Sequence, residues 1–187
     1  GYEYETISIN IDKAKPLYIG DSINKIVSLE LTDNSLLTHI EQLDIIDNRI
    51  LIYDKHRLMV FDINGLFLYT IGQKGLGPGE YTTINSYFVK GDTVNIYDAN
   101  LQKLFIYQMD GSFINSKRID ELMESVYPIN NKRFIGRKKY RGDKLQIPNL
   151  AILDKDFNLI ADIDNRFLKS GIVISDYCYT YNDNILY

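Results

Sequence analysis

The chain has 187 residues, of which 45% are hydrophobic, and a formal net charge of −4 at pH 7. This length and apolar content suit one domain, or a few small repeats that share a core, and they exclude a disordered chain. The acidic balance gives no general attraction to nucleic acid or to anionic lipid, both of which favour a basic protein surface.

Signals for a membrane span or a leader peptide are absent from the sequence. No run approaches the ~18 apolar residues of a membrane helix. The opening GYEYET has no basic-then-apolar pattern, so we expect any export signal to have been removed before this point. The single cysteine, Cys178, cannot form an internal disulfide, so packing must stabilise the fold. Fifteen Tyr and eight Phe against four Pro favour strands over helices.

Residues 1–39 do not match the repeats that follow them. Two strands are predicted there, at 4–11 and 26–31, and in the second Val27, Leu29 and Leu31 alternate with polar residues. Such an atypical terminal segment suits a closure strand. We expect it to pair with strands near the C-terminus and so to remove open sheet edges.

Residues 40–81 form the clearest repeat unit. Four short strands are predicted in it, at Glu41–Ile46, Ile50–Tyr53, Leu58–Asp62 and Phe67–Ile71. They are joined at Asp47–Asn48, Lys55–His56 and Asn64–Gly65. Asn, Asp and Gly tolerate the positive φ that tight hairpin turns require. The unit is therefore interpreted as a four-stranded antiparallel meander.

A second unit, at about 82–120, repeats the first. The tripeptide Ile-Tyr-Asp ends at Asp54 and again at Asp98, 44 residues later, and the turn glycine Gly65 recurs at Gly111, 46 residues later. Four strands at a period in the forties are typical of a propeller blade. We predict a structural role for the signature residues of these units: Asp54, Gly65, Gly72, Gly75, Gly77, Pro78, Gly79, Glu80, Asp98 and Gly111.

A third, degenerate unit spans about 121–165. Leu150 follows Leu104 by 46 residues, and Phe157 takes the place of the turn glycine. A further unit begins within 166–187, where Asn182–Asn184 resembles a first hairpin turn. The sequence thus predicts a single all-β domain. It is a propeller of four-stranded antiparallel blades that is incomplete or is part of a six-bladed ring.

Two repeated features invite a chemical interpretation. The glycine-rich loop from Gly72 to Glu80 contains Lys74, but a phosphate-binding loop needs a following helix and a Ser or Thr after the lysine, so we interpret it as a connector between blades. Asp54 and Asp98 could line a ring axis as metal ligands or acids. Their recurrence in each unit instead favours acceptance of backbone N–H bonds in the following turn.

Catalytic and metal-binding residues are not predicted. His39 and His56 have no ligand spacing to each other or to Cys178, which lies in an aromatic strand and is expected to be a buried thiol. No Gly-x-Ser-x-Gly elbow is present. The dense basic stretch at 133–144 supplies the weak candidates for ligand binding, with a solvated hairpin as the alternative. These candidates are Arg137, Lys138, Tyr140 and Arg141.

The stretch Asp54–Tyr81, DKHRLMVFDINGLFLYTIGQKGLGPGEY, resembles an NHL-type repeat. Together with KIVSLELTDNSLLTHI at Lys25–Ile40, it is similar to six-bladed β-propeller proteins of Bacteroides and relatives. The resemblance implies an exported protein of the cell envelope, periplasmic or an outer-membrane lipoprotein, with a function that is largely unassigned in the family. Six blades at this period need far more than 187 residues, so the blade number stays open.

The leading functional hypothesis is a non-catalytic binding or scaffold propeller without a cofactor, whose partner is a protein, peptide or glycan. The alternative is a hydrolase or lactonase-like enzyme with a central Ca²⁺, for which Asp44, Asn85 and Asn130 are the residues of interest. Nucleic acid is not an expected partner. Incomplete blades leave self-association as a further possibility.

Overall fold

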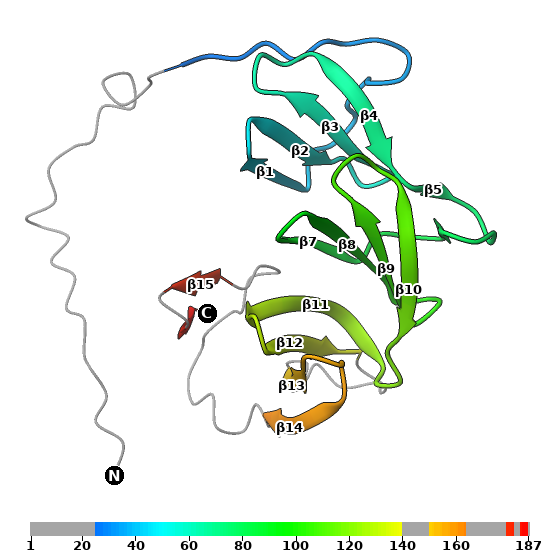
Figure 1. Cartoon of the computed structure of the whole chain (residues 1–187), viewed down its shortest axis with the longest axis vertical. Helices are drawn as coiled ribbons and strands as arrows, with labels where there is room; N and C mark the ends of the chain where they lie inside the picture. Colours follow the sequence, from blue (N-terminus) through cyan, green and yellow to red (C-terminus); the bar gives the residue numbers. More distant parts are fainter. Residues whose placement is uncertain (1–24, 140–149, 164–178, 182–183, 187) are drawn as a thin grey trace, which may run out of the picture.

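The structure is a computed structural model that describes residues 25–139, 150–163, 179–181 and 184–186. Three four-stranded antiparallel sheets follow one another along the chain, each with its strands in sequential order (Figure 1). The first contains β1 (Gln42–Ile46), β2 (Arg49–Tyr53), β3 (Leu58–Asp62) and β4 (Phe67–Ile71). The second contains β7 (Ser86–Lys90), β8 (Thr93–Asp98), β9 (Lys103–Gln108) and β10 (Phe113–Arg118). The third contains β11 (Met123–Asn130), β12 (Arg133–Lys138), β13 (Leu150–Asp154) and β14 (Leu159–Ile163).

The three sheets stand side by side in an arc. In Figure 1 the first strands β1, β7 and β11 line its concave side, and the last strands β4, β10 and β14 lie outermost. This is the arrangement of blades in a propeller, which confirms the all-β class and the four-stranded antiparallel unit. Within the described ranges the sheets do not form a closed ring.

The first sheet agrees with the sequence expectation to within one residue at every strand end. Its β1–β2 turn has positive φ at both central residues, Asp47 (47°) and Asn48 (62°). This is the signature of a two-residue primed turn, whose twist matches that of the flanking strands. Leu51 and Val60, which pair across β2 and β3, are fully buried.

The turn between the third and fourth strands is the same in all three sheets. Its left-handed position is Gly65 (φ 92°), then Gly111 (φ 89°), then Phe157 (φ 65°), so the predicted substitution of phenylalanine for glycine occurs without a change of turn. In each case this residue donates its N–H to the carbonyl three positions earlier, on Asp62, Gln108 and Asp154 respectively. In each sheet the fourth strand also carries a bulge three residues after this turn residue, at Leu68, Ile114 and Ile160.

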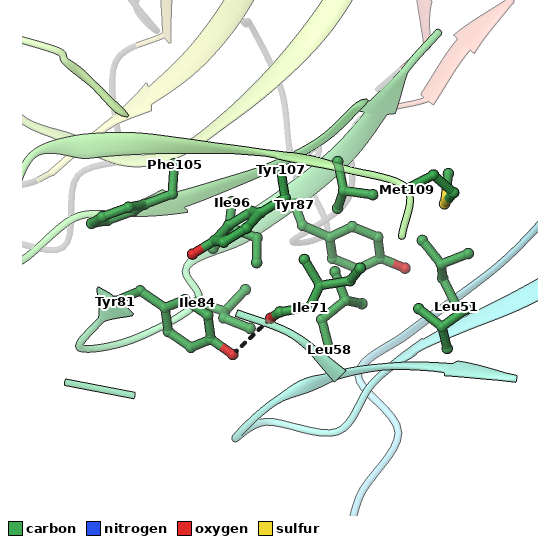
Figure 2. Close-up of a cluster of buried hydrophobic side chains, with 12 residues drawn as sticks. Leu51, Leu58, Ile71, Tyr81, Ile84, Tyr87, Ile96, Phe105, Tyr107 and Met109 are labelled. Atoms are coloured by element: carbon green, nitrogen blue, oxygen red, sulfur yellow. Dashed lines mark hydrogen bonds between the residues drawn. The ribbon is translucent and has the colours of Figure 1, made fainter. Parts of the chain in front are cut away.

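Apolar clusters fill the two spaces between neighbouring sheets. Leu51, Leu58 and Ile71 of the first sheet pack against Tyr87 and Tyr107 of the second (Figure 2). In the same cluster the Tyr81 hydroxyl donates a 3.3 Å hydrogen bond to the carbonyl of Ile71. A second cluster joins the second and third sheets and includes Phe88, Tyr97, Leu104, Val126 and Phe134. The sheets are therefore held to each other mainly face to face, by their buried apolar surfaces.

The prediction of a strand at 26–31 is wrong, because this segment has no strand pairing. Val27 and Leu29 still pack as expected, onto the face of the first sheet that points away from the second. Glu30 explains the irregular path: its N–H donates to the Gly65 carbonyl at 2.7 Å, and its carboxylate accepts the Phe67 N–H at 3.0 Å. The segment is thus fixed by a turn and not by a strand edge. The predicted strand at 4–11 lies outside the described residues.

Two short strand pairs complete the described structure. β5 (Gln73–Lys74) and β6 (Glu80–Tyr81) are parallel, and they close the glycine-rich loop. β15 (Tyr179–Tyr181) and β16 (Asn184–Leu186) form a hairpin at the site where a further unit is predicted to begin. In the parts of the chain that the structure describes, this hairpin has no N-terminal strand beside it, and the strand at 4–11 that is predicted to take part in closure lies outside those parts.

Candidate functional site

The tyrosine of each Ile-Tyr-Asp motif connects one sheet to the next. The Tyr53 hydroxyl donates to the Ile84 carbonyl at 2.6 Å, and the Tyr97 hydroxyl donates to the Met123 carbonyl at 3.3 Å. Burial raises the pKa of both phenols to about 12, so both stay protonated as donors at neutral pH. These bonds hold the segment before β7 and the first residue of β11 at fixed positions beside the preceding sheet.

The segment before β7 and the starts of β1 and β11 border a pocket of about 560 Å³, which we call the inner-strand pocket. It draws on three successive sheets at the same end of their first strands, together with the β2–β3 turn. Its lining residues are Glu41, Gln42, Tyr53, Lys55, His56, Thr83, Ile84, Asn85, Ser86, Glu124, Ser125, Tyr127 and Arg137. The volume lies in the ordinary range for small-molecule sites.

The chemistry of the inner-strand pocket is polar and balanced in charge. The carboxylates of Glu41 and Glu124 lie on its wall with the cations Lys55 and Arg137. Arg137 forms an ion pair with Glu124, with 3.2 Å between Nε and the carboxylate oxygen. Because opposite charges accompany amides, hydroxyls and two tyrosines, the wall suits an uncharged or zwitterionic ligand with many hydrogen-bonding groups.

Of the four binding residues proposed from the basic stretch, the structure describes Arg137 and Lys138, and these two lie in different surroundings. Arg137 lines the inner-strand pocket. Lys138 instead bridges two carboxylates, at 2.6 Å from Asp162 and 3.3 Å from Glu121. Burial alone would lower the pKa of Lys138, but these two carboxylates raise it above its usual value. Tyr140 and Arg141 lie outside the described residues.

Asp98 organises the loop that leads into the inner-strand pocket. Its Oδ2 accepts hydrogen bonds from the Thr82 N–H (2.6 Å), the Thr82 hydroxyl (2.7 Å) and the Thr83 N–H (3.1 Å). Its Oδ1 accepts the N–H groups of Asn100 (2.9 Å) and Leu101 (3.1 Å) in the turn that follows. Both oxygens of this buried carboxylate are therefore saturated by donors of the protein itself.

Asp54 occupies the matching place in the first sheet with fewer partners. Its Oδ2 accepts only the Thr38 N–H, at 3.3 Å, and its buried Oδ1 has no hydrogen-bond partner. For Oδ1 the difference follows the length of the turn, since Leu58 follows Asp54 by four residues, whereas Leu104 follows Asp98 by six. This difference of two residues in turn length also explains why the repeated aspartates are 44 residues apart and the turn glycines 46 residues apart.

The glycine-rich loop is built around Glu80. The Glu80 carboxylate accepts the Gly77 N–H at 2.8 Å and the Gln73 side-chain amide at 2.6 Å. These hydrogen bonds, the one from Gly77 foremost, hold the pKa of Glu80 below its usual value. The Glu80 carboxylate thus occupies the Gly77 N–H, a backbone donor that a phosphate bound in this loop would need. Gly72 and Gly79 have positive φ, at 62° and 73°.

The residues named for a calcium-dependent enzyme are spread over the described structure. The Asp44 carboxylate accepts hydrogen bonds from Tyr87 (2.5 Å) and Gln42 (2.9 Å). Asn85 lines the inner-strand pocket, but its Oδ1 accepts the Ala99 N–H at 2.9 Å. Asn130 lies at the far end of β11, where its Oδ1 accepts two backbone N–H groups of the β11–β12 turn.

The described residues also contain no cluster of three or more His, Cys, Asp or Glu side chains that could hold a metal ion. His39 lies 3.7 Å from Glu41, and His56 borders the inner-strand pocket. Cys178 falls outside the described ranges. In the same part of the chain, no helix has the length and apolar character of a membrane span.

Comparison with known proteins gives a family without an assigned function. The profile of the family described as "Domain of unknown function (DUF4934)" matches residues 5–187. No curated protein matches the sequence.

Among solved structures, a protein of Bacteroides fragilis NCTC 9343 that is named as a candidate exported protein shares 24% identity, with a TM-score of 0.69. The match covers 85% of this chain and 47% of that protein, so the chain spans about half the length of this neighbour. A member of the DUF4221 family from Bacteroides vulgatus has 10% identity and a TM-score of 0.47, over 69% of this chain and 43% of its own. The Neurospora crassa Pan2 WD40 domain has 6% identity and a TM-score of 0.37, and the match covers 66% of this chain and 51% of that domain.

Proposed function

The chain belongs to the DUF4934 family, and from this premise we propose that it is a non-catalytic binding domain of the bacterial cell envelope. Its ligand is a protein segment, peptide or glycan that enters the inner-strand pocket. The observation that carries the proposal is the convergence of three successive sheets on this one cavity. Binding sites are typically concave and preformed, with a few converging polar groups.

The composition of the wall supports a ligand rich in hydrogen-bonding groups. Tyr53 and Tyr127 offer aromatic faces against which a sugar ring or a peptide plane can pack. The side chains of Gln42 and Thr83 add polar groups on two different sheets. Because the sheets are fixed by buried clusters and by the tyrosine hydrogen bonds, the wall is preorganised, which lowers the entropic cost of binding.

The cellular location is also part of the proposal. Support comes from the neighbour that is named as a candidate exported protein. Expression of the natural gene with a C-terminal tag, followed by fractionation, tests it: recovery with the periplasm or the outer membrane is expected, and recovery in the cytosol would contradict it.

The functional experiment is a binding screen. The purified domain is applied to arrays of bacterial and host glycans and of peptides, and each hit is measured by isothermal titration calorimetry. Loss of a charge in Glu41→Gln or Lys55→Gln is expected to weaken a hit about three- to tenfold. Lys103→Gln, on the exposed start of β9, is the matched control and is expected to leave the affinity unchanged. Calcium-dependent hydrolysis of a lactone or ester by the domain would contradict the proposal.

Self-association remains a proposal of its own. Leu43 and Ile45 of β1 are 48% and 63% exposed, on the face that points away from the second sheet. Tyr87, which has the position of Leu43 in the second sheet, is fully buried against the first sheet. The first sheet therefore presents an apolar surface of the kind that the other sheets bury. Light scattering across a concentration series tests whether Leu43→Ser lowers the mass of the particle.

A further inference from the structure

We propose a second ligand site, on the outer side of the first sheet, that binds a carboxylate carrying an apolar chain. It is a groove of about 570 Å³ along β4, bounded by residue 34, the β2–β3 turn and the start of the glycine-rich loop, and we call it the β4 groove. It is separate in lining from the inner-strand pocket except for His56, which borders both.

The charge of the β4 groove has one sign. Arg57 and Lys74 line it together with His56, and among the described residues no Asp or Glu side chain does. Neither Arg57 nor Lys74 forms an ion pair with a carboxylate in the described part of the chain. In a chain of net charge −4, two cations without a carboxylate partner in one groove favour an anionic ligand.

Arg57 is held in place before any ligand arrives. Its two terminal nitrogens donate to the carbonyls of Asn34 at 2.8 Å and Leu36 at 2.7 Å. A guanidinium has five N–H donors, so three remain for a ligand. Carbonyl partners fix the geometry of the group without neutralising its charge, which makes it a preorganised site for a carboxylate.

Three aromatic residues line the β4 groove beside the polar residues Asn34, Thr70 and Gln73. Phe67, Tyr69 and Tyr81 line the groove, and the hydroxyls of Tyr69 and Tyr81 are engaged with the carbonyls of Met109 and Ile71. Tyr81 is fully buried, so the aromatic surface open to a ligand comes from Phe67 and Tyr69. With its hydroxyl engaged by the protein, Tyr69 contributes mainly the apolar face of its ring.

The two kinds of wall are separated along β4. Ile71 pairs with Leu58, which places Arg57 and Lys74 near the C-terminal end of this strand. Phe67 is at its N-terminal end, four residues away, or about 13 Å at the rise of a strand. A groove with a cationic end and an aromatic end of this length matches a medium-chain fatty acid, with the carboxylate at Arg57 and Lys74 and the chain toward Phe67.

The chain offers a convenient probe, because it has only two histidines. His56 borders the β4 groove, whereas His39 does not line it. Decanoate, below its micelle-forming concentration, is titrated into the protein while the imidazole C–H signals are followed by proton NMR. The His56 signals are expected to shift in a saturable way and the His39 signals to stay in place.

Variants and analogues separate this site from adsorption elsewhere. Lys74→Gln is expected to weaken decanoate about fivefold, and Lys103→Gln, which removes the same charge from the second sheet, to have no effect. Decanol is expected to bind less tightly than decanoate, and decyltrimethylammonium not to displace it.

Three results would overturn the proposal. They are an unchanged His56 signal, decanoate affinity unaltered by Lys74→Gln, or equal binding of the cationic analogue. A His56 shift that survives Lys74→Gln would assign the ligand to the inner-strand pocket instead.

Discussion

The Tyr87 hydroxyl donates a 2.5 Å hydrogen bond to the Asp44 carboxylate, and this bond joins the first strand of one sheet to the first strand of the next. The other tyrosine hydrogen bonds described between these two sheets have carbonyl acceptors, whereas this one has a charged acceptor. Burial, followed by the hydrogen bond to Asp44, raises the pKa of Tyr87 far above its ordinary value. The phenol therefore stays protonated at neutral pH and donates to Asp44 across the concave side of the arc.

Tyr87→Phe is expected to destabilise the domain by about 1–2 kcal/mol, because it removes a hydrogen bond to a charged acceptor while keeping the ring. Tyr69→Phe is the matched control, since its hydroxyl donates to the neutral carbonyl of Met109 at 2.6 Å. We expect the control to cost about half as much. Urea unfolding followed by circular dichroism measures both, and equal costs would show that the charge of Asp44 adds nothing.

Stability is expected to fall steeply at alkaline pH. The fully buried Tyr81 and Tyr97 have pKa values of about 12, against 10.0 for an exposed tyrosine. A raised folded-state pKa gives stability that is fully present below pH 10 and is lost as the pH rises toward 12, because the unfolded chain loses its phenolic protons first. Urea midpoints between pH 8 and 11.5 test this, and Tyr97→Phe is expected to make the decline shallower. A midpoint independent of pH up to 11.5 would contradict it.

The two repeated aspartates are expected to differ in their contribution to stability. Asp98→Asn places an NH₂ group among five donors, so a loss of about 2–4 kcal/mol is expected. Asp54→Asn is expected to cost less than about 1 kcal/mol, because Asp54 accepts only one long hydrogen bond and its Oδ1 has no partner. Thermal denaturation of the two variants side by side provides the comparison, and a larger loss at Asp54 would refute it.

Phe157→Gly tests why the third unit departs from the repeat. Glycine would relieve a φ of 65°, which costs a bulky residue about 1–2 kcal/mol. The ring, however, lies 4.3 Å from that of Phe134 and is nearly buried, and loss of such a side chain costs about 3–5 kcal/mol. The net change is expected to be destabilising by about 2 kcal/mol in chemical denaturation. A stabilised variant would mean that packing against Phe134 contributes little.

Much of the fold could be predicted from the sequence, because the turns carry their own chemistry. Asp47–Asn48 and Gly65 specify hairpins of defined geometry, and these fix the strand ends between them. The segment at 26–31 was predicted wrongly because its alternation is that of a strand, while its backbone is held by contacts of Glu30 with a distant turn. Such tertiary contacts override local periodicity and leave no trace in a single sequence.

The inner-strand pocket could not be predicted in the same way. Its lining comes from three repeats whose relative position depends on the packing of whole sheets, and most of its polar residues are unremarkable in sequence. One signal was present: the tyrosine before each repeated aspartate, which connects its own sheet to the next. Of the basic stretch, Arg137 lies at the pocket, whereas Lys138 is engaged by two carboxylates, a difference that the charge density of the sequence does not reveal.

The most direct test of the binding function is to block the inner-strand pocket. Thr83 lines it, and its side chain is partly exposed, so Thr83→Trp fills the cavity without removing a buried group. Ser116→Trp, on the exposed face of β10, is the matched control. For the best ligand from the arrays, calorimetry is expected to show at least a tenfold loss of affinity for Thr83→Trp and none for Ser116→Trp. Undiminished binding to a folded Thr83→Trp domain would contradict the assignment of this pocket as the binding site.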